Sequence, residues 1–329
     1  MLPRPDRRSL GGLPRSALLL ALLAGFTPAA RANHGPGTSG GGSSTVSGET
    51  LRAGGFDLSL RTDVTWYESF TRAEAASRAM QHGEFDGLHR SLVETLGIAW
   101  GATDDLQVGA QLGWYRGTGF VAAEDDGMGG ADVATADPRG LTDLWLQAKL
   151  RVLRGPGGHL ACLAGVKLPT GDDDEELSDG SELEPSSQPG TGAVDFQFGL
   201  AYSRYLSART TLDASGVYTF RGEHGGFEVG DRLDAGAALA YRLTEDVRHF
   251  PNWSLSAELL GVWIGQDEEG GARNENSGGT TVYLAPGVRG RLNPHVAVSL
   301  APSVPVFQDL DGDQVETRAR VACTLSFTL

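Results

Sequence analysis

The stretch AVDFQFGLAYSRY, residues 193–205, decides the fold because its side chains alternate in polarity. Successive side chains of a β-strand point to opposite sides of a sheet, so the stretch predicts a strand with one apolar face. That face meets either the core of a soluble sandwich or the lipid around a membrane barrel. The apolar residues at every second position are Val194, Phe196, Phe198, Leu200 and Tyr202.

The same alternation recurs in twelve runs along the chain. Many of these runs are longer than the roughly five or six residues usual in soluble sheets. The breaks between them alternate between long and short, which is typical of a barrel with long external loops and short periplasmic turns. The runs cover residues 54–69, 90–100, 106–121, 141–153, 159–169, 191–205, 210–223, 229–243, 253–266, 280–292, 295–308 and 314–329.

The sequence therefore predicts an all-β fold, a transmembrane up-and-down antiparallel β-barrel of about twelve strands. An even strand number fits single-chain barrels of the bacterial outer membrane. The break lengths place both ends of the barrel in the periplasm and residues 172–184 outside the cell. A short helix is expected at residues 71–81, within the first long loop.

The N-terminal region predicts export to the cell outer membrane. Residues 1–32 have the features of a cleaved signal peptide, because arginines precede a short apolar run at residues 17–26 and Ala30-Arg31-Ala32 fits a cleavage site. Residues 33–53 are predicted to form a flexible Gly/Ser-rich leader or plug, which could enter the barrel from the periplasmic side. Residues 54–329 are predicted to form the barrel.

The bulk composition excludes several classes of function. The net charge of −15 argues against nucleic acid as a partner. No segment approaches 18 consecutive apolar residues, so no transmembrane helix is predicted. Cys162 and Cys323 fall on strands that are not neighbours, so no disulfide is expected, and no cofactor is predicted.

The polar face of the predicted strands carries charges of both signs. In a membrane barrel these side chains line a wet lumen. They would form charge ladders that stiffen the wall, a lining that selects solutes, or both. The lumen candidates are Asp57, Arg61, Asp63, Asp143, Lys149, Arg151, Lys167, Asp195, Asp234, Arg242, Glu258, Arg289, Arg318 and Arg320.

Two acidic segments are candidates for cation binding. Residues 171–185 are a solvated loop, a pore mouth that gathers cations, or a segment that bridges to lipopolysaccharide through Mg²⁺ or Ca²⁺. The acidic residues of this mouth loop are Asp172, Asp173, Asp174, Glu175 and Glu176. The run DLDGDQVE at residues 309–316 fails the EF-hand pattern, which leaves only a weak calcium candidate. Its ligands would be Asp309, Asp311 and Asp313.

Three segments together resemble the outer-membrane transporter family named for the MetA pathway of phenol degradation. They are GLTDLWLQAKLRVL at residues 140–153, GVKLPTGD at 165–172 and PGTGAVDFQFGLAYSRYL at 189–206. They match, in order, the G-x-x-D-L strand, the K-L-P-T-G strand end and the G-T-G-x-x-D strand of that family. The resemblance implies passage of small, including aromatic, compounds through the outer membrane.

The sequence thus predicts a non-enzymatic barrel channel for passive passage of small solutes, with outer-membrane lipid and lipopolysaccharide around it. A non-conducting structural or adhesive barrel is the main alternative. A barrel phospholipase is a further alternative, but it needs a serine and a histidine in contact on the lipid-facing wall. The oligomeric state and the identity of the solute are not predicted.

Overall fold

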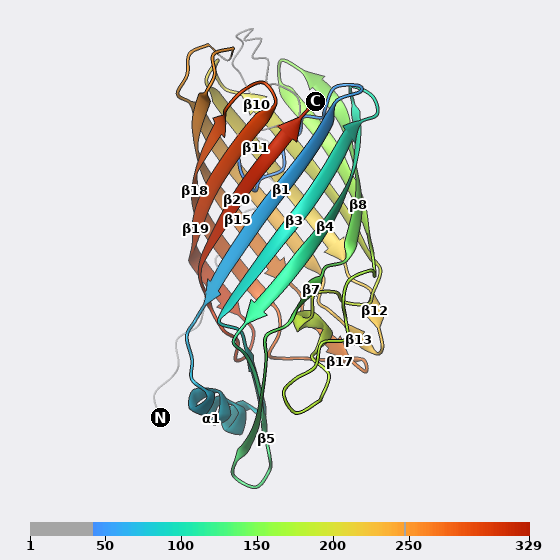
Figure 1. Ribbon diagram of the computed structural model, residues 1–329, viewed down its shortest axis with the longest axis vertical. Helices are drawn as coiled ribbons and strands as arrows, with labels where there is room; N and C mark the ends of the chain where they lie inside the picture. The colour runs from blue at the N-terminus through green and yellow to red at the C-terminus, as the bar shows by residue number, and fades with distance from the viewer. Residues whose placement is uncertain (1–41, 247) are drawn as a thin grey trace, which may run out of the picture.

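The computed structural model describes residues 42–246 and 248–329. Twelve antiparallel strands close into a barrel, because β1 pairs with β20 as well as with β3 (Figure 1). This confirms the predicted fold, while the predicted signal peptide and residues 33–41 lie outside the described residues. The barrel strands are β1 (Phe56–Tyr67), β3 (Arg90–Gly101), β4 (Leu106–Thr118), β8 (Leu144–Gly155), β9 (Gly158–Leu168), β10 (Asp195–Tyr205), β11 (Thr210–Phe220), β14 (Arg232–Arg242), β15 (Asn252–Ile264), β18 (Gly279–Arg291), β19 (Val296–Leu310) and β20 (Thr317–Thr328).

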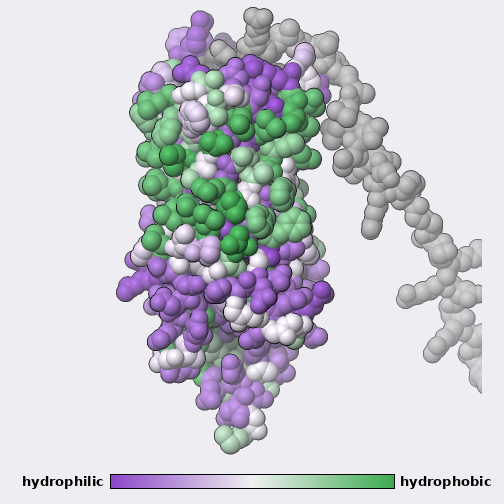
Figure 2. Space-filling model, turned by 90° about the vertical axis from the view of Figure 1, so that its right-hand side faces the viewer, coloured by the Kyte–Doolittle hydropathy of each residue, from purple (hydrophilic) through white to green (hydrophobic). Residues whose placement is uncertain are grey.

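The apolar face of each strand points away from the barrel axis. In β10, Phe196 is 51% exposed and Leu200 is 55% exposed, whereas Asp195 is 1% exposed. On the face seen in Figure 2, a band of hydrophobic side chains crosses the wall, with hydrophilic side chains above and below it. A barrel that spans a membrane presents such a band to lipid.

The two ends of the barrel differ. The C-terminus and the short turns lie at one end, here called the terminal end, and the long loops lie at the other, the long-loop end (Figure 1). No helix within the described ranges is long and apolar enough to cross a membrane. The elements outside the barrel strands are α1 (Arg72–His82), β2 (Glu84–Gly87), β5 (Phe120–Asp125), β6 (Ala131–Ala136), β7 (Arg139–Leu141), the 3₁₀ helix Pro185–Ser187, β12 (Glu223–His224), β13 (Phe227–Glu228), β16 (Glu268–Glu269) and β17 (Ala272–Arg273).

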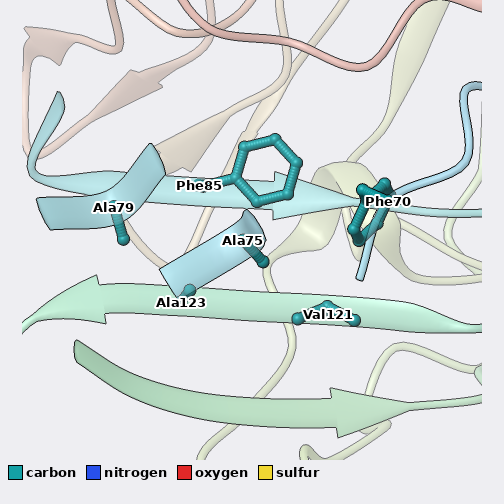
Figure 3. Packing of buried hydrophobic residues seen from close by; sticks show 6 residues of the cluster. All are labelled: Phe70, Ala75, Ala79, Phe85, Val121 and Ala123. Atoms are coloured by element: carbon teal, nitrogen blue, oxygen red, sulfur yellow. The ribbon is translucent and has the colours of Figure 1, made fainter. Parts of the chain in front are cut away.

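The first two long loops build a small folded unit, here called the loop unit, from α1, β2, β5 and β6. Its helix begins one residue inside the predicted range, and Thr71 and Glu74 cap it reciprocally as a capping box. Gly119 adopts a positive φ of 70° between β4 and β5, which lets the chain leave the barrel wall there. The unit has its own apolar core, which Figure 3 shows, of Phe70, Ala75, Ala79, Phe85, Val121 and Ala123.

Candidate functional site

The barrel wall is interrupted between β7 and β8. β7 pairs with the long-loop half of β4, and β8 pairs with the terminal half. Thr142 bridges the interruption, since its hydroxyl accepts a hydrogen bond from the Gly113 amide at 2.9 Å and its own amide donates to the Gly113 carbonyl. The predicted continuous run at residues 141–153 is therefore broken, and the following residue, Asp143, lies outside the strand ladder and is buried.

Asp143 gathers backbone amides from two other segments. Its Oδ1 accepts hydrogen bonds from the amides of Thr170 at 3.1 Å and Gly171 at 2.9 Å, and its Oδ2 accepts one from the Thr191 amide at 3.1 Å. These donors belong to the KLPTG and GTG segments. A side chain at Gly171 would meet the Leu141 carbonyl at 2.8 Å, so the close approach requires glycine there.

Lys167 completes this cluster, here called the motif hub: Asp143, Lys167 and Asp195. Lys167 Nζ lies 3.1 Å from Asp143 Oδ2 and 2.8 Å from Asp195 Oδ2, and all three side chains are at most 5% exposed. Asp195 Oδ1 also accepts a hydrogen bond from the Gly222 amide, and Arg221 Nε lies 3.8 Å from its Oδ2. Each buried charge thus has a partner of opposite sign. All three segments that carry the sequence resemblance meet at this point of the wall.

Residues 42–53, here called the lumen segment, are held inside the barrel. The carboxylate of Glu258, on β15, accepts hydrogen bonds from the backbone amides of Ser43, Ser44 and Thr45 and from the Thr45 hydroxyl. Arg61, on β1, donates a hydrogen bond to the Ser43 carbonyl. Hydrogen bonds to an ionised carboxylate are stronger than those between neutral groups, so Glu258 is the main anchor of this end.

The rest of the lumen segment bonds to strands around the wall. The amide of Val46 donates to Ser215 on β11, that of Gly48 to Ser203 on β10, and that of Leu51 to Gln107 on β4. Lys149 on β8 donates to the Ser47 carbonyl, and Tyr205 donates to the carboxylate of Glu49. The segment therefore runs from mid-depth to the terminal end with partners on many strands.

Among the described residues, cavities lie along the barrel interior, and three of them adjoin the lumen segment or the motif hub. One of about 220 Å³ and another of about 250 Å³ both touch Val46, so the lumen segment separates them. The third, here called the vestibule, has a volume of about 700 Å³ and lies between the motif hub and the long loops. Five aromatic residues line the vestibule, namely Tyr67, Phe85, Tyr115, Phe120 and Trp145.

Most predicted lumen residues take part in polar contacts inside the barrel. Arg61 pairs with Asp63, and Asp234 pairs with Arg232. At the terminal end, Asp57 accepts from the Thr328 hydroxyl, Arg151 pairs with Asp105, and Arg242 donates to the Ala208 carbonyl. The guanidinium of Arg320 lies 5.0 Å from the centre of the Tyr283 ring, and Arg289 is half-buried on β18.

Arg318 departs from the predicted lumen set. The register between β1 and β20 shifts at this residue, because Trp66 faces Ala319 while Tyr67 faces Thr317. A β-bulge leaves one residue without a cross-strand partner and reverses the alternation on one side of it. The Arg318 side chain is consequently 56% exposed and contacts Glu68 and Glu316 at the long-loop rim.

The acidic mouth loop is folded rather than extended. The Asp172 side chain accepts a hydrogen bond from the Leu141 amide at 2.8 Å. The backbones of Glu176 and Glu182 pair as an isolated antiparallel β-bridge. Leu183 is 1% exposed, and Gln188 donates to its carbonyl. Asp172, Asp174 and Glu176 nevertheless remain exposed to solvent.

The weak calcium candidate does not assemble. The carboxylate of Asp313 is engaged by Arg78 of α1, which lowers the pKa of Asp313 below its usual value. Within residues 42–246 and 248–329, no three His, Cys, Asp or Glu side chains come close enough to hold a metal ion. Asp309 lies at the end of β19, and Asp311 lies in the loop that follows, without such a site.

Several interior polar residues were missing from the sequence-based set. Asp213 is fully buried on β11 and accepts from Ser203. Arg221 and Arg232 reach the vestibule from the two ends of the loop between β11 and β14. Asp213 follows the same alternation as the predicted set, so the periodicity could have found it. Arg221 lies in the predicted run 210–223 on the same face as Asp213, so the alternation could have found it as well, although the observed strand β11 ends at Phe220.

Comparison with known proteins places these features in a family. The model of the family described as the MetA-pathway of phenol degradation matches residues 34–304, which include all three segments of the motif hub. No curated protein sequence matches the chain.

Solved outer-membrane structures are similar to this chain to different degrees. The COG4313 outer membrane channel from Pseudomonas putida F1 superposes with a TM-score of 0.57 at 14% identity, over 85% of this chain and 97% of that one. The TodX deltaS2S3 mutant monoaromatic hydrocarbon channel gives a TM-score of 0.42 at 11% identity, over 85% of this chain and 91% of that one. At these identities the likeness to the first structure concerns the fold.

Proposed function

Because the chain belongs to the family described as the MetA-pathway of phenol degradation, we propose that it is an outer-membrane channel for passive passage of small solutes. The observation that carries this proposal is the inverted polarity of the barrel. Apolar side chains face outward, while charged and polar side chains surround a series of interior cavities. A soluble sandwich would place these two faces the other way round.

We infer that the lumen segment acts as a plug that closes the channel. Its hydrogen bonds to Glu258, Ser215 and Ser203 hold it across the interior, with a small cavity on either side of Val46. Passage of a solute therefore requires that the segment move or leave. All of its side-chain anchors are polar, so water can replace each bond when the segment is released.

The solutes that fit best are small compounds with an apolar, including aromatic, body. The aromatic side chains of the vestibule offer ring faces and edges. A volume of about 700 Å³ lies within the range of small-molecule pockets. The description of the family, which names phenol degradation, supports this choice of solute.

Planar-bilayer recording tests the proposal. The refolded full chain should give rare current steps, and a variant without residues 42–52 should conduct several-fold more, because the anchored part of the lumen segment is gone. A variant without residues 33–41 is the matched control, since it keeps every described anchor. A folded barrel that never conducts in any of the three forms would contradict the channel function.

A non-conducting adhesive barrel is the second candidate. The loop unit favours it, because α1, β2, β5 and β6 project beyond the wall with a core of their own (Figure 1). Hydrolysis of lipid has less support, since within the described ranges no hydrogen bond joins a serine to a histidine. Lipid hydrolysis by the purified protein would favour the enzyme over both other candidates.

We further propose that the exposed carboxylates of the mouth loop face lipopolysaccharide through divalent cations. Asp172, Asp174 and Glu176 lie at the long-loop end, where such cations could share their oxygens with phosphate groups. Binding to lipopolysaccharide that weakens on chelation of Mg²⁺ and on neutralising these three residues would support this contact. Binding unchanged by both treatments would contradict it.

A further inference from the structure

The cavity of about 220 Å³ beside Val46, here called the arginine cavity, has charged side chains of both signs in its lining. Three of them are guanidinium groups and two are carboxylates, so the lining has one positive charge in excess. They come from β1 and β20, which are neighbours, and from β14, which lies across the barrel from them. The charged residues of the arginine cavity are Arg61, Asp63, Arg232, Asp234 and Arg320.

Each of the two carboxylates is neutralised by one arginine of its own strand. Arg61 Nε and Nη2 donate to the two oxygens of Asp63 at 2.6 and 2.8 Å. Arg232 Nε and Nη2 donate in the same way to the two oxygens of Asp234, both at 2.7 Å. This bidentate geometry is typical of strong arginine–carboxylate pairs. Both oxygens of each aspartate are therefore engaged by an arginine other than Arg320.

Arg320 is the guanidinium that has no anionic partner. Within residues 42–246 and 248–329, its guanidinium makes no hydrogen bond and no ion pair. It lies 5.0 Å from the centre of the Tyr283 ring, a contact that holds the group in place and leaves its N–H donors available. The carboxylate of Glu258 does not compensate this charge, since both of its oxygens accept hydrogen bonds from the lumen segment.

Hydroxyl groups add further donors to the lining. Ser303 is the cross-strand neighbour of Arg320 on β19 and lines the same cavity. Ser215 accepts a hydrogen bond from the Val46 amide, so its hydroxyl hydrogen remains for another acceptor. Together with Arg320, these groups suit a ligand that brings negative charge and hydrogen-bond acceptors.

We propose that the arginine cavity binds the carboxylate of a small organic acid, with Arg320 as the main recognition residue. One excess positive charge matches a monoanion, and the planar fork of an arginine holds a carboxylate by two parallel hydrogen bonds. A volume of about 220 Å³ is smaller than most pockets for drug-sized ligands, so the cavity admits a small acid or the head of a larger one.

The neighbouring vestibule favours acids with an aromatic body. Arg232 lines both the arginine cavity and the vestibule, so a solute that extends past Arg232 reaches the cavity that carries the aromatic side chains. Aromatic rings there can pack against an aromatic solute. The binding site is a property of the barrel interior, and only its place on a path across the membrane rests on the proposed channel function.

Calorimetric titration of the refolded full chain in detergent micelles tests the site without any need for conduction. The probe is benzoate, and benzamide is its uncharged counterpart of nearly the same shape. Salt at about 0.15 M screens charges over about 8 Å, which weakens the opposition of the acidic mouth to an anion. Benzoate should bind about ten- to a hundredfold more tightly than benzamide, the effect of one hydrogen-bonded charge. Titration of empty micelles corrects for partition into detergent.

Variants of β20 assign the effect to Arg320. Arg320→Gln should weaken the binding of benzoate about tenfold or more and leave that of benzamide unchanged. Arg320→Lys keeps the charge but loses the planar fork, so it should keep part of the preference for benzoate. Arg318→Gln is the matched control, because it removes the same charge two residues away at the long-loop rim, and it should bind benzoate as the native chain does. Each variant is first checked for a folded barrel by its mobility in gels before and after heating.

Three outcomes would overturn the site. The native chain could bind benzoate and benzamide equally well, Arg320→Gln could keep the preference for benzoate, or inorganic phosphate could bind where benzoate does not. If benzoate binds through Arg320 while the bilayer stays silent, the channel function fails and the site stands. If the bilayer conducts while the two compounds bind alike, the site fails and the channel function stands.

Discussion

Lys167→Met tests whether the motif hub holds the interrupted wall together. Lys167 Nζ is the cation between Asp143 and Asp195, and all three side chains are buried. Removing one partner of a buried ion pair costs about 3–5 kcal/mol, because the remaining charge keeps its desolvation penalty. Arg221 stays 3.8 Å from Asp195, so we expect a loss near 3 kcal/mol in the free energy of unfolding.

The assay is urea unfolding of the barrel in lipid vesicles, followed by tryptophan fluorescence. Lys167→Met with Asp195→Asn should recover part of the loss, because one of the two unpaired carboxylates is removed. Arg154→Met is the control, since Arg154 is an exposed base near the terminal end of β8 and should change stability by less than about 0.5 kcal/mol. The reasoning fails if Lys167→Met costs less than about 1 kcal/mol, or if the double variant is less stable than the single one.

Three further predictions concern the segment, the wall and the mouth. Glu258→Ala should raise the population of barrels with a released lumen segment about ten- to a hundredfold, which is the equivalent of one charged hydrogen bond. A cysteine placed at Ser44 should then be labelled faster by a thiol reagent. An unchanged labelling rate would argue against Glu258 as the anchor. Leu200→Arg, in the middle of β10, should cost about 2–4 kcal/mol of folding free energy in vesicles, and Phe196→Arg, near the end of β10, about 0–1 kcal/mol. Equal costs would contradict the placement of Leu200 near the middle of the bilayer and of Phe196 near its surface. Reversal potentials in KCl gradients should show cation preference at low salt, and neutralising the mouth should weaken it, whereas anion preference would assign selectivity to the lumen. The residues to neutralise are Asp172, Asp173, Asp174, Glu175 and Glu176.

The barrel was predictable because its signals are local. Side-chain alternation repeats every two residues, and short turns fix which runs are neighbours, so residues 193–205 and the other runs define the wall without knowledge of the fold. The capped helix α1 was predictable for the same reason, since Thr71 and Glu74 lie three residues apart.

The candidate site was predictable only as a set of residue types. Asp143 was expected on the polar face of a strand, but it lies in an interruption, where it binds amides from segments about 30 and 50 residues away in sequence. The bulge at Arg318 has no local signature in the alternation. The burial of Leu183 depends on contacts between loops, which a pattern confined to one segment does not contain.

The lumen segment also has a consequence for how the barrel is assembled. Its partners lie on β4, β8, β10, β11 and β15, which together occupy much of the circumference. An incomplete sheet offers only a few of these hydrogen-bond partners at the distances that the lumen segment can span. A barrel with fewer or more strands would place the partners too close to one another or too far apart. The segment thus acts as an internal gauge of diameter, which favours the twelve-strand cylinder over incomplete or oversized intermediates during biogenesis.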